Sequence, residues 1–575
     1  MTLFYFSIKA DESDGAGLDS FSLHRIAYAV LCILFFTCTF SLKPCRAEKN
    51  TDALREALAD YMVCFRLELM GFEKQELAVS SKVFCLTEVY PENDLRPYWV
   101  TPNGPGQKAS IVLDFLKMAE GEGLDPANYE VEEISRLFAA RDTPSLALLD
   151  ALLTFNLIKY IHDVSSGQIK QLYAEPGLFP DAENIKFNPR STMKKVLGTP
   201  DLAVYLQSLP PAHRHYTGLK KALKIYRAIE NDGGWPLIAA GTTIQPGDYD
   251  VRIPAIMLRL SVTNDLDLTT TQIPFETQYS PELEQSIMKL QQRHGLDPDG
   301  TIGPKTLAAL NVPAGERIKQ IIVNMTRWRW QKHDLGEKYI LVNIAHFDLT
   351  AFEADQFAFG MRVIVGKFLN QTPIFSDRIK TIVINPYWTI PKSIARNEEL
   401  PKLRKNPDCL RKRHIRLFSG WEDDATEIDP TTIDWQTVSW TRMGQYRLRQ
   451  DPGPWNALGQ IKFVFPNKYK VYLHDTPAQS LFSHHKRDFS HGCIRVSDPV
   501  KLAAFALSRQ RGEAWTPKTI KNAVNKQERI GLGMSEKLPV HITYQTAWFD
   551  KHGIVCFNYD VYGRDKKLLR ALFEE

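Results

Sequence analysis

A cysteine lies close to two histidines in the last third of this sequence. The string Ser490-His491-Gly492-Cys493 comes shortly after His474. A thiolate is a far stronger nucleophile than a thiol, and a neighbouring imidazole commonly generates one near neutral pH. Cys493 is therefore a candidate nucleophile, and His474 is the candidate general base that takes its proton.

The segments on both sides of this pair predict an ordered site. Residues 470–473 alternate like a strand, which would place His474 at a strand end. After the cysteine, Asp498 and Pro499 are typical of a helix N-cap followed by proline at the first helical position. We therefore expect Cys493 on a loop held between a strand and a helix.

The residues next to the nucleophile suggest further roles. The backbone N–H groups of Gly492 and Cys493 are candidate oxyanion donors, because glycine lets the chain approach a substrate closely. His491 would shape the loop or help to polarise the substrate. Ser490 is expected to be structural rather than nucleophilic, because the adjacent thiol is the stronger nucleophile. Either the carboxyl group of Asp475 or a backbone carbonyl could orient the catalytic histidine.

Length and composition indicate several folded domains. A chain of 575 residues is too long for one hydrophobic core. Its 44% hydrophobic and 24% charged residues are ordinary for a globular protein. The net charge of +4 is small for this length, so charge alone gives no support for nucleic-acid binding.

An apolar segment near the N-terminus indicates export. Residues 26–40 are apolar or small throughout, and Arg25 precedes them. This segment is short for a transmembrane span and has the length of a signal-peptide core. We assign residues 1–48 to a signal peptide or an N-terminal membrane anchor. No other segment is apolar enough to span a bilayer.

The cysteines outside the export segment are odd in number: Cys64, Cys85, Cys409, Cys493 and Cys556. Cys64 and Cys85 are close enough in sequence for a disulfide in an oxidising compartment, and two buried thiols are an equal alternative. No Cys-x-x-Cys pair exists, which disfavours a zinc or thioredoxin-type site. We expect no metal and no organic cofactor.

The first half of the chain predicts a mainly helical scaffold domain over residues 49–270. Several stretches show helical apolar spacing, and the part from residue 236 onward is turn-rich like a transition or linker. His162 and Asp163 lie together on one helical pattern, where they are expected to form a structural pair rather than a site.

Residues 275–316 predict a small three-helix module. Residues 281–294 form an amphipathic pattern, a tight loop follows at residues 295–300, and a second helix begins at residue 306. This pattern resembles the peptidoglycan-binding domain family almost throughout. A helical spacer that binds no sugar is the alternative reading.

Residues 320–575 predict a mainly β catalytic domain with an insert at about residues 390–447. β-branched residues are enriched in its strands, and residues 538–562 predict two more strands joined by a hairpin turn. The insert breaks the strand pattern and would act as a lid. Its basic cluster could attract an acidic substrate, and a solvated charged face is at least as good an explanation. The cluster comprises Lys392, Arg396, Lys402, Arg404, Lys405, Arg411, Lys412, Arg413 and Arg416.

The spacing from His474 to the Ser490-His491-Gly492-Cys493 string resembles the signature of the L,D-transpeptidase family, which has a YkuD-type catalytic domain. The order of helical scaffold, peptidoglycan-binding module and interrupted β domain resembles the large Gram-negative branch of that family over nearly the whole chain. The common motif has asparagine two residues after the cysteine. This chain has arginine there, which leaves the role of residue 495 open.

The resemblance implies an α+β multidomain enzyme that forms 3-3 cross-links in peptidoglycan. The cysteine would form a thioester with a tetrapeptide stem, release D-alanine, and pass the acyl group to a second stem. Such stems carry several carboxylates, which Arg495 and the insert could bind. Ser490, Tyr472 and Trp388 are further candidates for substrate contact. With the export segment, the resemblance implies a periplasmic location, and that segment could anchor the protein in the inner membrane. The small net charge predicts no nucleic-acid partner.

Other functions remain open at this level. Water could resolve the thioester, which would make the protein an L,D-carboxypeptidase, or a lipoprotein lysine could be the acceptor. A non-catalytic wall-binding scaffold would use only the helical regions, although the intact histidine and cysteine pattern speaks against it. A cysteine protease acting on proteins fits the flanking sequence less well.

Overall fold

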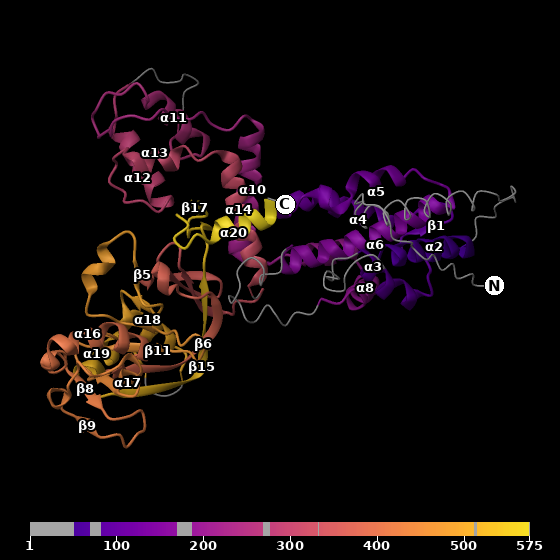
Figure 1. Ribbon diagram of the computed structural model, residues 1–575. Helices are drawn as coiled ribbons and strands as arrows, with labels where there is room; N and C mark the ends of the chain where they lie inside the picture. Colours follow the sequence, from indigo (N-terminus) through magenta and orange to yellow (C-terminus); the bar gives the residue numbers. More distant parts are fainter. Residues whose placement is uncertain are drawn as a thin grey trace, which may run out of the picture.

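The computed structural model describes residues 51–69, 82–168, 187–267, 277–331, 333–510 and 514–573. The predicted signal or anchor segment, residues 1–48, lies outside these residues, as does the side chain of Cys64 with its predicted disulfide. Figure 1 shows the scaffold helices on one side, with the small module and the catalytic domain on the other. The predicted α+β multidomain architecture is confirmed.

The scaffold is built from helices around a shared apolar core. Its central helix α6 (Thr143–Ser166) begins where Asp142 caps the backbone N–H of Ser145. By length and composition α6 could cross a membrane, contrary to the sequence-based expectation, but 78% of its apolar window is buried within the protein. The other helices are α2 (Thr51–Leu69), α3 (Lys82–Val89), α4 (Gln107–Lys117), α5 (Val131–Leu137), α8 (Pro189–Gly198) and α9 (Leu202–Gln207), beside the short hairpin of β1 (Val100–Thr101) and β2 (Gly104–Pro105).

His162 and Asp163 form the structural pair that their sequence position predicts. His162 Nδ1 lies 3.1 Å from a carboxylate oxygen of Asp163, and the Tyr129 hydroxyl donates to the other oxygen at 2.8 Å. Asp163 is buried inside the scaffold. Its carboxylate therefore ties α6 to the segment that carries Tyr129.

The small module contains three helices, α11 (Ile253–Val262), α12 (Pro281–Arg293) and α13 (Pro304–Leu310). α12 begins where the Ser280 hydroxyl accepts from the backbone N–H of Leu283. All three helices contribute to one core. The first helix lies within residues 236–275, which the sequence suggested were a transition between domains. That reading was wrong for α11, because Ile256 and Leu260 are fully buried in this core.

Two long helices join the module and scaffold to the catalytic domain: α10 (Arg214–Asn231) and α14 (Ala314–Trp330). They share an apolar cluster with the first strands and the C-terminal hairpin of the catalytic domain. Trp328 on α14 is almost fully buried there.

The catalytic domain is a closed mixed β-sheet. The strand order is β13-β5-β14-β12-β11-β6-β15-β3-β4, and an additional pairing of β4 with β5 closes the ring. Apolar side chains fill its interior, and helices α18 (Pro499–Leu507) and α19 (Pro517–Asn525) pack against that core. The strands are β3 (Lys338–Asn343), β4 (Asp348–Glu353), β5 (Gln356–Gly366), β6 (Phe375–Ile384), β11 (Ile461–Val464), β12 (Leu473–His474), β13 (Asp488–Ser490), β14 (Ile494–Val496) and β15 (Ile530–Thr543).

An insert between β6 and β11 has its own sheet and core. The sheet has the order β7-β10-β8-β9, and short helices pack over an apolar cluster on one of its faces. The elements are β7 (Trp388–Thr389), α15 (Lys392–Ile394), the π-helical segment η6 (Ala395–Glu399), α16 (Leu400–Lys405), β8 (Ile415–Phe418), β9 (Glu427–Ile428), α17 (Trp440–Met443) and β10 (Arg447–Gln450).

Much of the basic cluster of the insert is bound within the insert itself. Lys402 and Arg413 both pair with Glu399, at 2.9 and 2.5 Å, and Arg416 pairs with Glu427. These cations hold the insert together, so they are less available to an acidic substrate than the sequence suggested.

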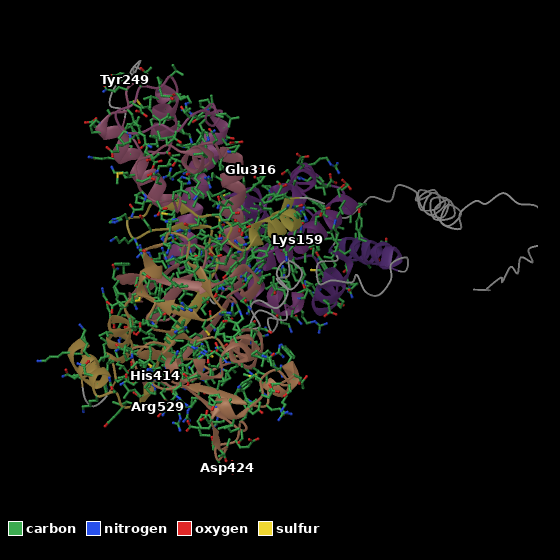
Figure 2. All side chains as sticks on the ribbon, turned by 60° about the vertical axis from the view of Figure 1, so that its left-hand side comes forward. Lys159, Tyr249, Glu316, His414, Asp424 and Arg529 are labelled. Carbon is green, nitrogen blue, oxygen red and sulfur yellow. The ribbon has the colours of Figure 1, made fainter. Side chains whose placement is uncertain are left out.

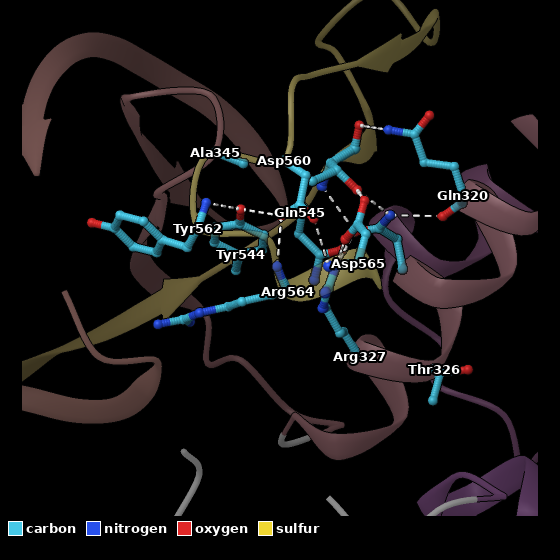
Figure 3. A network of polar contacts seen from close by, with 12 residues as sticks. Gln320, Thr326, Arg327, Ala345, Tyr544, Gln545, Asp560, Tyr562, Arg564 and Asp565 are labelled. Carbon is cyan, nitrogen blue, oxygen red and sulfur yellow. Dashed lines mark hydrogen bonds and ion pairs between the residues drawn. The ribbon is translucent and has the colours of Figure 1, made fainter. Parts of the chain in front are cut away.

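The chain ends in a hairpin of β16 (Ala547–Phe549) and β17 (Val555–Phe557), followed by α20 (Arg564–Phe573). The buried carboxylate of Asp565 accepts from Arg327 of α14 and from the Thr546 hydroxyl, both at 2.6 Å (Figure 3). Burial raises the pKa of Asp565, whereas Arg327 lowers it. The network fixes the C-terminal hairpin and α20 against α14.

Candidate active site

The predicted catalytic residues lie on one face of two neighbouring strands. β12 pairs in parallel with β14, with Leu473 opposite Ile494 and His474 opposite Arg495. Leu473 and Ile494 point into the barrel core. Because side chains alternate along a strand, His474 and Arg495 lie on the opposite face of the sheet.

Tyr472 lies two residues before His474, and Cys493 lies two residues before Arg495, so both are on the same face as that pair. The backbone N–H of Ile494 donates to the Tyr472 carbonyl at 3.1 Å, which keeps the register of the pair. The Tyr472 ring centroid lies 5.6 Å from that of His474. The sheet thus brings together His474, Cys493, Arg495 and Tyr472, all of which the sequence had named.

A backbone carbonyl orients His474. Its Nδ1 lies 2.5 Å from the carbonyl oxygen of Asp475, whereas the Asp475 carboxylate accepts from the Gln460 N–H at 2.9 Å and from Gln479 Nε2 at 3.2 Å. With the proton on Nδ1, Nε2 is the basic nitrogen. Of the two alternatives that the sequence left open, the carbonyl is the one the geometry supports.

His474 is neutral at physiological pH. Burial, and then the nearby Arg495 guanidinium, lower its pKa to about 3. An imidazole must be unprotonated to act as a base. A depressed pKa therefore keeps the His474 imidazole unprotonated far into the acidic range.

This depressed pKa predicts a particular pH profile. The base form of His474 is lost only as the pH falls through its folded pKa, so kcat/KM should show no acid limb near pH 6.5, the usual imidazole value. We expect kcat/KM for the donor substrate to stay within about twofold between pH 7 and pH 5. A measured acid limb centred near pH 6.5 would contradict this assignment of the base.

Cys493 is partly buried and is protonated at rest. Burial raises the pKa of its thiol, while Tyr472, Lys462 and Arg495 act in the opposite direction. Its Sγ lies 4.0 Å from the Lys470 carbonyl, and within the described chain no hydrogen bond joins it to His474. The two side chains are diagonal neighbours on adjacent strands. Catalytic hydrogen bonds of this kind often tighten only when substrate is bound.

Lys462 is a member of this face that the sequence analysis missed. It lies opposite His474 on β11, and its Nζ is 3.8 Å from the Tyr472 ring centroid. Burial lowers the pKa of Lys462, which faces no carboxylate among the described residues. In the sequence, Lys462 stands between the apolar residues Ile461 and Phe463, which are core residues in the structure. This alternation could have predicted that Lys462 lies on the opposite face of the strand.

The loop before Cys493 is held by hydroxyl groups. The Ser490 hydroxyl donates to the Cys493 carbonyl at 2.6 Å and accepts from the Gly492 N–H at 3.1 Å. Gly492 has φ of +111°, and Thr372 donates to its carbonyl at 2.9 Å. The Gly492 N–H, one of the two oxyanion donors that the sequence suggested, is therefore already engaged within the loop.

His491 connects this loop to the insert. Its Nε2 lies 2.6 Å from a carboxylate oxygen of Glu398 in η6, and both side chains are about two-fifths exposed. The sequence analysis named His491 but not Glu398, because only the fold brings the insert to the loop. The contact can hold the insert beside the nucleophile.

We predict a modest effect when this contact is removed. A half-exposed pair of this kind contributes about 0.2–1 kcal/mol, so Glu398→Ala should lower kcat/KM by no more than about fivefold. Asp424→Ala is the matched control, because Asp424 lies at the outer end of the insert (Figure 2). Equal kinetics for the two variants and the unmodified protein would show that the contact has no part in turnover.

Two predicted substrate contacts have different surroundings. Trp388 packs partly buried against the core of the insert. Arg495 lies on the catalytic face, its Nε is buried without a hydrogen-bond partner, and no carboxylate pairs with it among the described residues.

Three family models match separate parts of this chain. Residues 85–223 match a scaffold domain, residues 264–310 match a putative peptidoglycan binding domain, and residues 337–530 match an L,D-transpeptidase catalytic domain. The chain carries an L,D-transpeptidase catalytic domain. The matched residues contain the whole β12–β14 face and the insert. The family resemblance drawn from the sequence is confirmed.

Known L,D-transpeptidases are similar to parts of the chain. A putative L,D-transpeptidase of Haemophilus influenzae is 30% identical over 231 residues, which are 40% of this chain and 45% of that protein. The match thus spans less than half of the relative.

Solved structures of L,D-transpeptidases show weaker similarity. One from Mycobacterium smegmatis is 11% identical over 36% of this chain and 58% of its own, with a TM-score of 0.17. One from Xylanimonas cellulosilytica is 14% identical over 53% of this chain and 99% of its own, with a TM-score of 0.16. With these TM-scores the solved structures carry no argument. The catalytic domain is assigned from the family model that matches residues 337–530.

Proposed function

We propose that this protein is a cysteine-dependent L,D-transpeptidase that forms 3-3 cross-links in peptidoglycan. The observation that carries the proposal is the shared face of β12 and β14. This face holds a thiol, a neutral imidazole and the Arg495 guanidinium, whose buried Nε has no hydrogen-bond partner among the described residues, within a transpeptidase-type catalytic domain. The peptidoglycan-binding-like module supports the same class of substrate.

In the first half-reaction the thiol proton passes from Cys493 Sγ to His474 Nε2 while sulfur attacks the donor carbonyl. That carbonyl belongs to the third residue of a tetrapeptide stem, meso-diaminopimelate. The Cys493 N–H would stabilise the oxyanion. The carbon–nitrogen bond to D-alanine then breaks, and the departing amine takes the proton from His474. The product is a thioester on Cys493.

In the second half-reaction the side-chain amine of another stem replaces D-alanine. The amine nitrogen bonds to the thioester carbon while His474 takes a proton from the amine. The carbon–sulfur bond then breaks. The thiol recovers its proton from His474. If water attacks instead, the product is a free tripeptide. Exclusion of water by the insert would favour the amine.

Replacement of Arg495 should weaken donor binding. A charge-assisted hydrogen bond to a carboxylate is worth about 1.5–3 kcal/mol, so Arg495→Ala should raise the donor KM by about 10- to 100-fold. Arg495→Lys should recover part of this loss. Arg411→Ala is the control, since Arg411 lies in the insert with a 70% exposed side chain. An unchanged donor KM in Arg495→Ala would show that Arg495 does not bind a donor carboxylate.

Product analysis tests the proposed reaction. The purified protein without residues 1–48 is incubated with disaccharide-tetrapeptide, and the products are separated and identified by mass. We expect a cross-linked dimer together with free D-alanine. Tripeptide as the sole product would identify an L,D-carboxypeptidase. No turnover by a well-folded sample would favour a wall-binding scaffold.

The proposed location is the periplasm, where peptidoglycan stems are accessible. Residues 1–48 would direct export and would either be removed or remain as an inner-membrane anchor. Fractionation of cells that produce the tagged full-length chain tests this directly. Recovery in the cytoplasmic fraction would contradict it.

A further inference from the structure

A cavity of about 820 Å³ lies between the small module, the long helices and the catalytic domain. α12 contributes Lys289 and Gln292 to its lining, and α10 contributes His215. The barrel contributes Asp348 of β4, and the C-terminal hairpin contributes Trp548. None of the residues of the β12–β14 catalytic face lines it, so this cavity is separate from the thiol.

Aromatic rings form much of the wall. The Trp548 ring centroid lies 4.4 Å from that of His346, and Phe357 lines the cavity with 38% of its surface exposed. Deeper in the wall, His215 stacks on Trp328 with centroids 5.1 Å apart and planes 9° from parallel. Flat apolar rings of this kind provide stacking surfaces for a ligand that has an apolar face.

Several polar atoms in the wall lack partners. Trp328 Nε1, Trp548 Nε1, His215 Nε2 and Gln545 Oε1 are buried and have no hydrogen-bond partner among the described residues. Trp328, His215 and Gln545 are each more than nine-tenths buried. Buried polar groups are normally paired, so these four atoms call for a partner that the protein itself does not supply among its described residues. The set contains both donors and an acceptor, as a hydroxyl- and amide-bearing ligand requires.

The charges around the cavity largely cancel. Arg293 and Asp265 form an ion pair with each other, so neither is free for a ligand. Burial raises the pKa of Asp348 to about 7, against the influence of Arg487 and Arg362. A wall with no strong charge of one sign does not select an anion or a cation.

We propose that this cavity binds an N-acetylated sugar unit of a peptidoglycan glycan strand. Stacking rings together with unpaired donors and an acceptor match a sugar ring with hydroxyl and acetamido groups. The choice of this sugar rests on the proposed function, since peptidoglycan strands consist of N-acetylated sugars. Because no residue of the β12–β14 face lines the cavity, the protein would hold the glycan strand at one site while it acts on stem peptides at the other. Two-site binding raises the local concentration of substrate.

The test uses a linear tetramer of N-acetylglucosamine, which is neutral and carries no stem peptide. Its affinity is measured by ligand-observed NMR titration of the protein without residues 1–48. Two variants remove aromatic surface from the cavity, Trp548→Ala and Phe357→Ala. Trp440→Ala is the matched control, because Trp440 is 55% exposed on the insert. Cys493→Ala serves as a second control.

We expect saturable binding to the unmodified, Trp440→Ala and Cys493→Ala proteins. Trp548→Ala should bind at least about tenfold more weakly, and Phe357→Ala should also be weakened. No binding to the well-folded protein would overturn the inference, as would equal affinity in all variants. Binding of a free stem peptide that Trp548→Ala abolishes, without sugar binding, would assign the cavity to peptide instead.

This experiment separates the inference from the proposed function. If the protein forms the thioester on Cys493 but binds no sugar, the proposed function stands and the proposed role of the cavity is wrong. A protein that binds the sugar through Trp548 but never acylates would retain the cavity assignment and lose the enzyme.

Discussion

Cys493→Ala is expected to abolish turnover of disaccharide-tetrapeptide, with kcat at least about 10⁴-fold lower than that of the unmodified protein. Removal of the nucleophile from a comparable acyl-transfer site costs about 10⁶-fold. Alanine leaves no sulfur to form the thioester, and the other side chains of the β12–β14 face provide no replacement nucleophile of similar strength. The loss is measured as dimer and D-alanine released per unit time.

A second cysteine variant controls for nonspecific effects. Cys409 is partly exposed in the insert, so Cys409→Ala should retain the activity of the unmodified protein. Circular dichroism and thermal unfolding should show that both variants are folded. Turnover by Cys493→Ala within tenfold of the unmodified rate would rule out the cysteine mechanism.

His474→Gln should lower kcat by about 10²- to 10⁴-fold, because general acid–base catalysis typically contributes that factor. Glutamine fills similar space on β12 but cannot accept and return the proton. The measurement is steady-state turnover at fixed, saturating donor. Donor KM should change much less than kcat, since His474 acts on the reacting atoms rather than on donor affinity.

Asp475→Asn tests how His474 is oriented. If the carboxylate held the imidazole, this change would cost about 10⁴-fold, as it does in a serine protease triad. Because the backbone carbonyl of Asp475 is the acceptor from His474 Nδ1, we expect kcat to fall by less than about tenfold. A loss as large as that of His474→Gln would instead assign the orienting role to the carboxylate.

The sequence alone predicts the central pair, because the signals for it are local. The alternating strand before His474 and the capped helix after Cys493 both follow from residue patterns over a few positions. They predicted where each residue would lie along the chain. They did not predict the parallel pairing of β12 with β14, which places the two side chains on one face and is seen only in the structure.

Partners from distant segments could not be predicted in this way. Lys462 joins the catalytic face through the pairing of β11 with β12, and Glu398 reaches His491 from the insert. Thr372 holds the Gly492 carbonyl from a loop more than a hundred residues earlier in the chain. Such contacts depend on tertiary structure, which a single sequence does not reveal.

The domain pattern shows a similar limit. The amphipathic spacing of α12 marked the module, whereas α11 lies within residues 236–275, which the sequence suggested were a transition between domains. Its buried Ile256 and Leu260 belong to the core of the module. A short apolar helix between turns has a weak periodic signal in the sequence. Its domain can therefore be assigned only from its packing in the structure.

The most direct test of the account is the mass of the intact protein after brief incubation with disaccharide-tetrapeptide, followed by peptide mapping of any adduct. The account predicts an adduct equal to the donor minus D-alanine, located on Cys493 and absent from Cys493→Ala. It also predicts that a diaminopimelate-containing acceptor removes the adduct as dimer appears. An adduct on any other residue, or dimer formed by Cys493→Ala, would contradict the central claim.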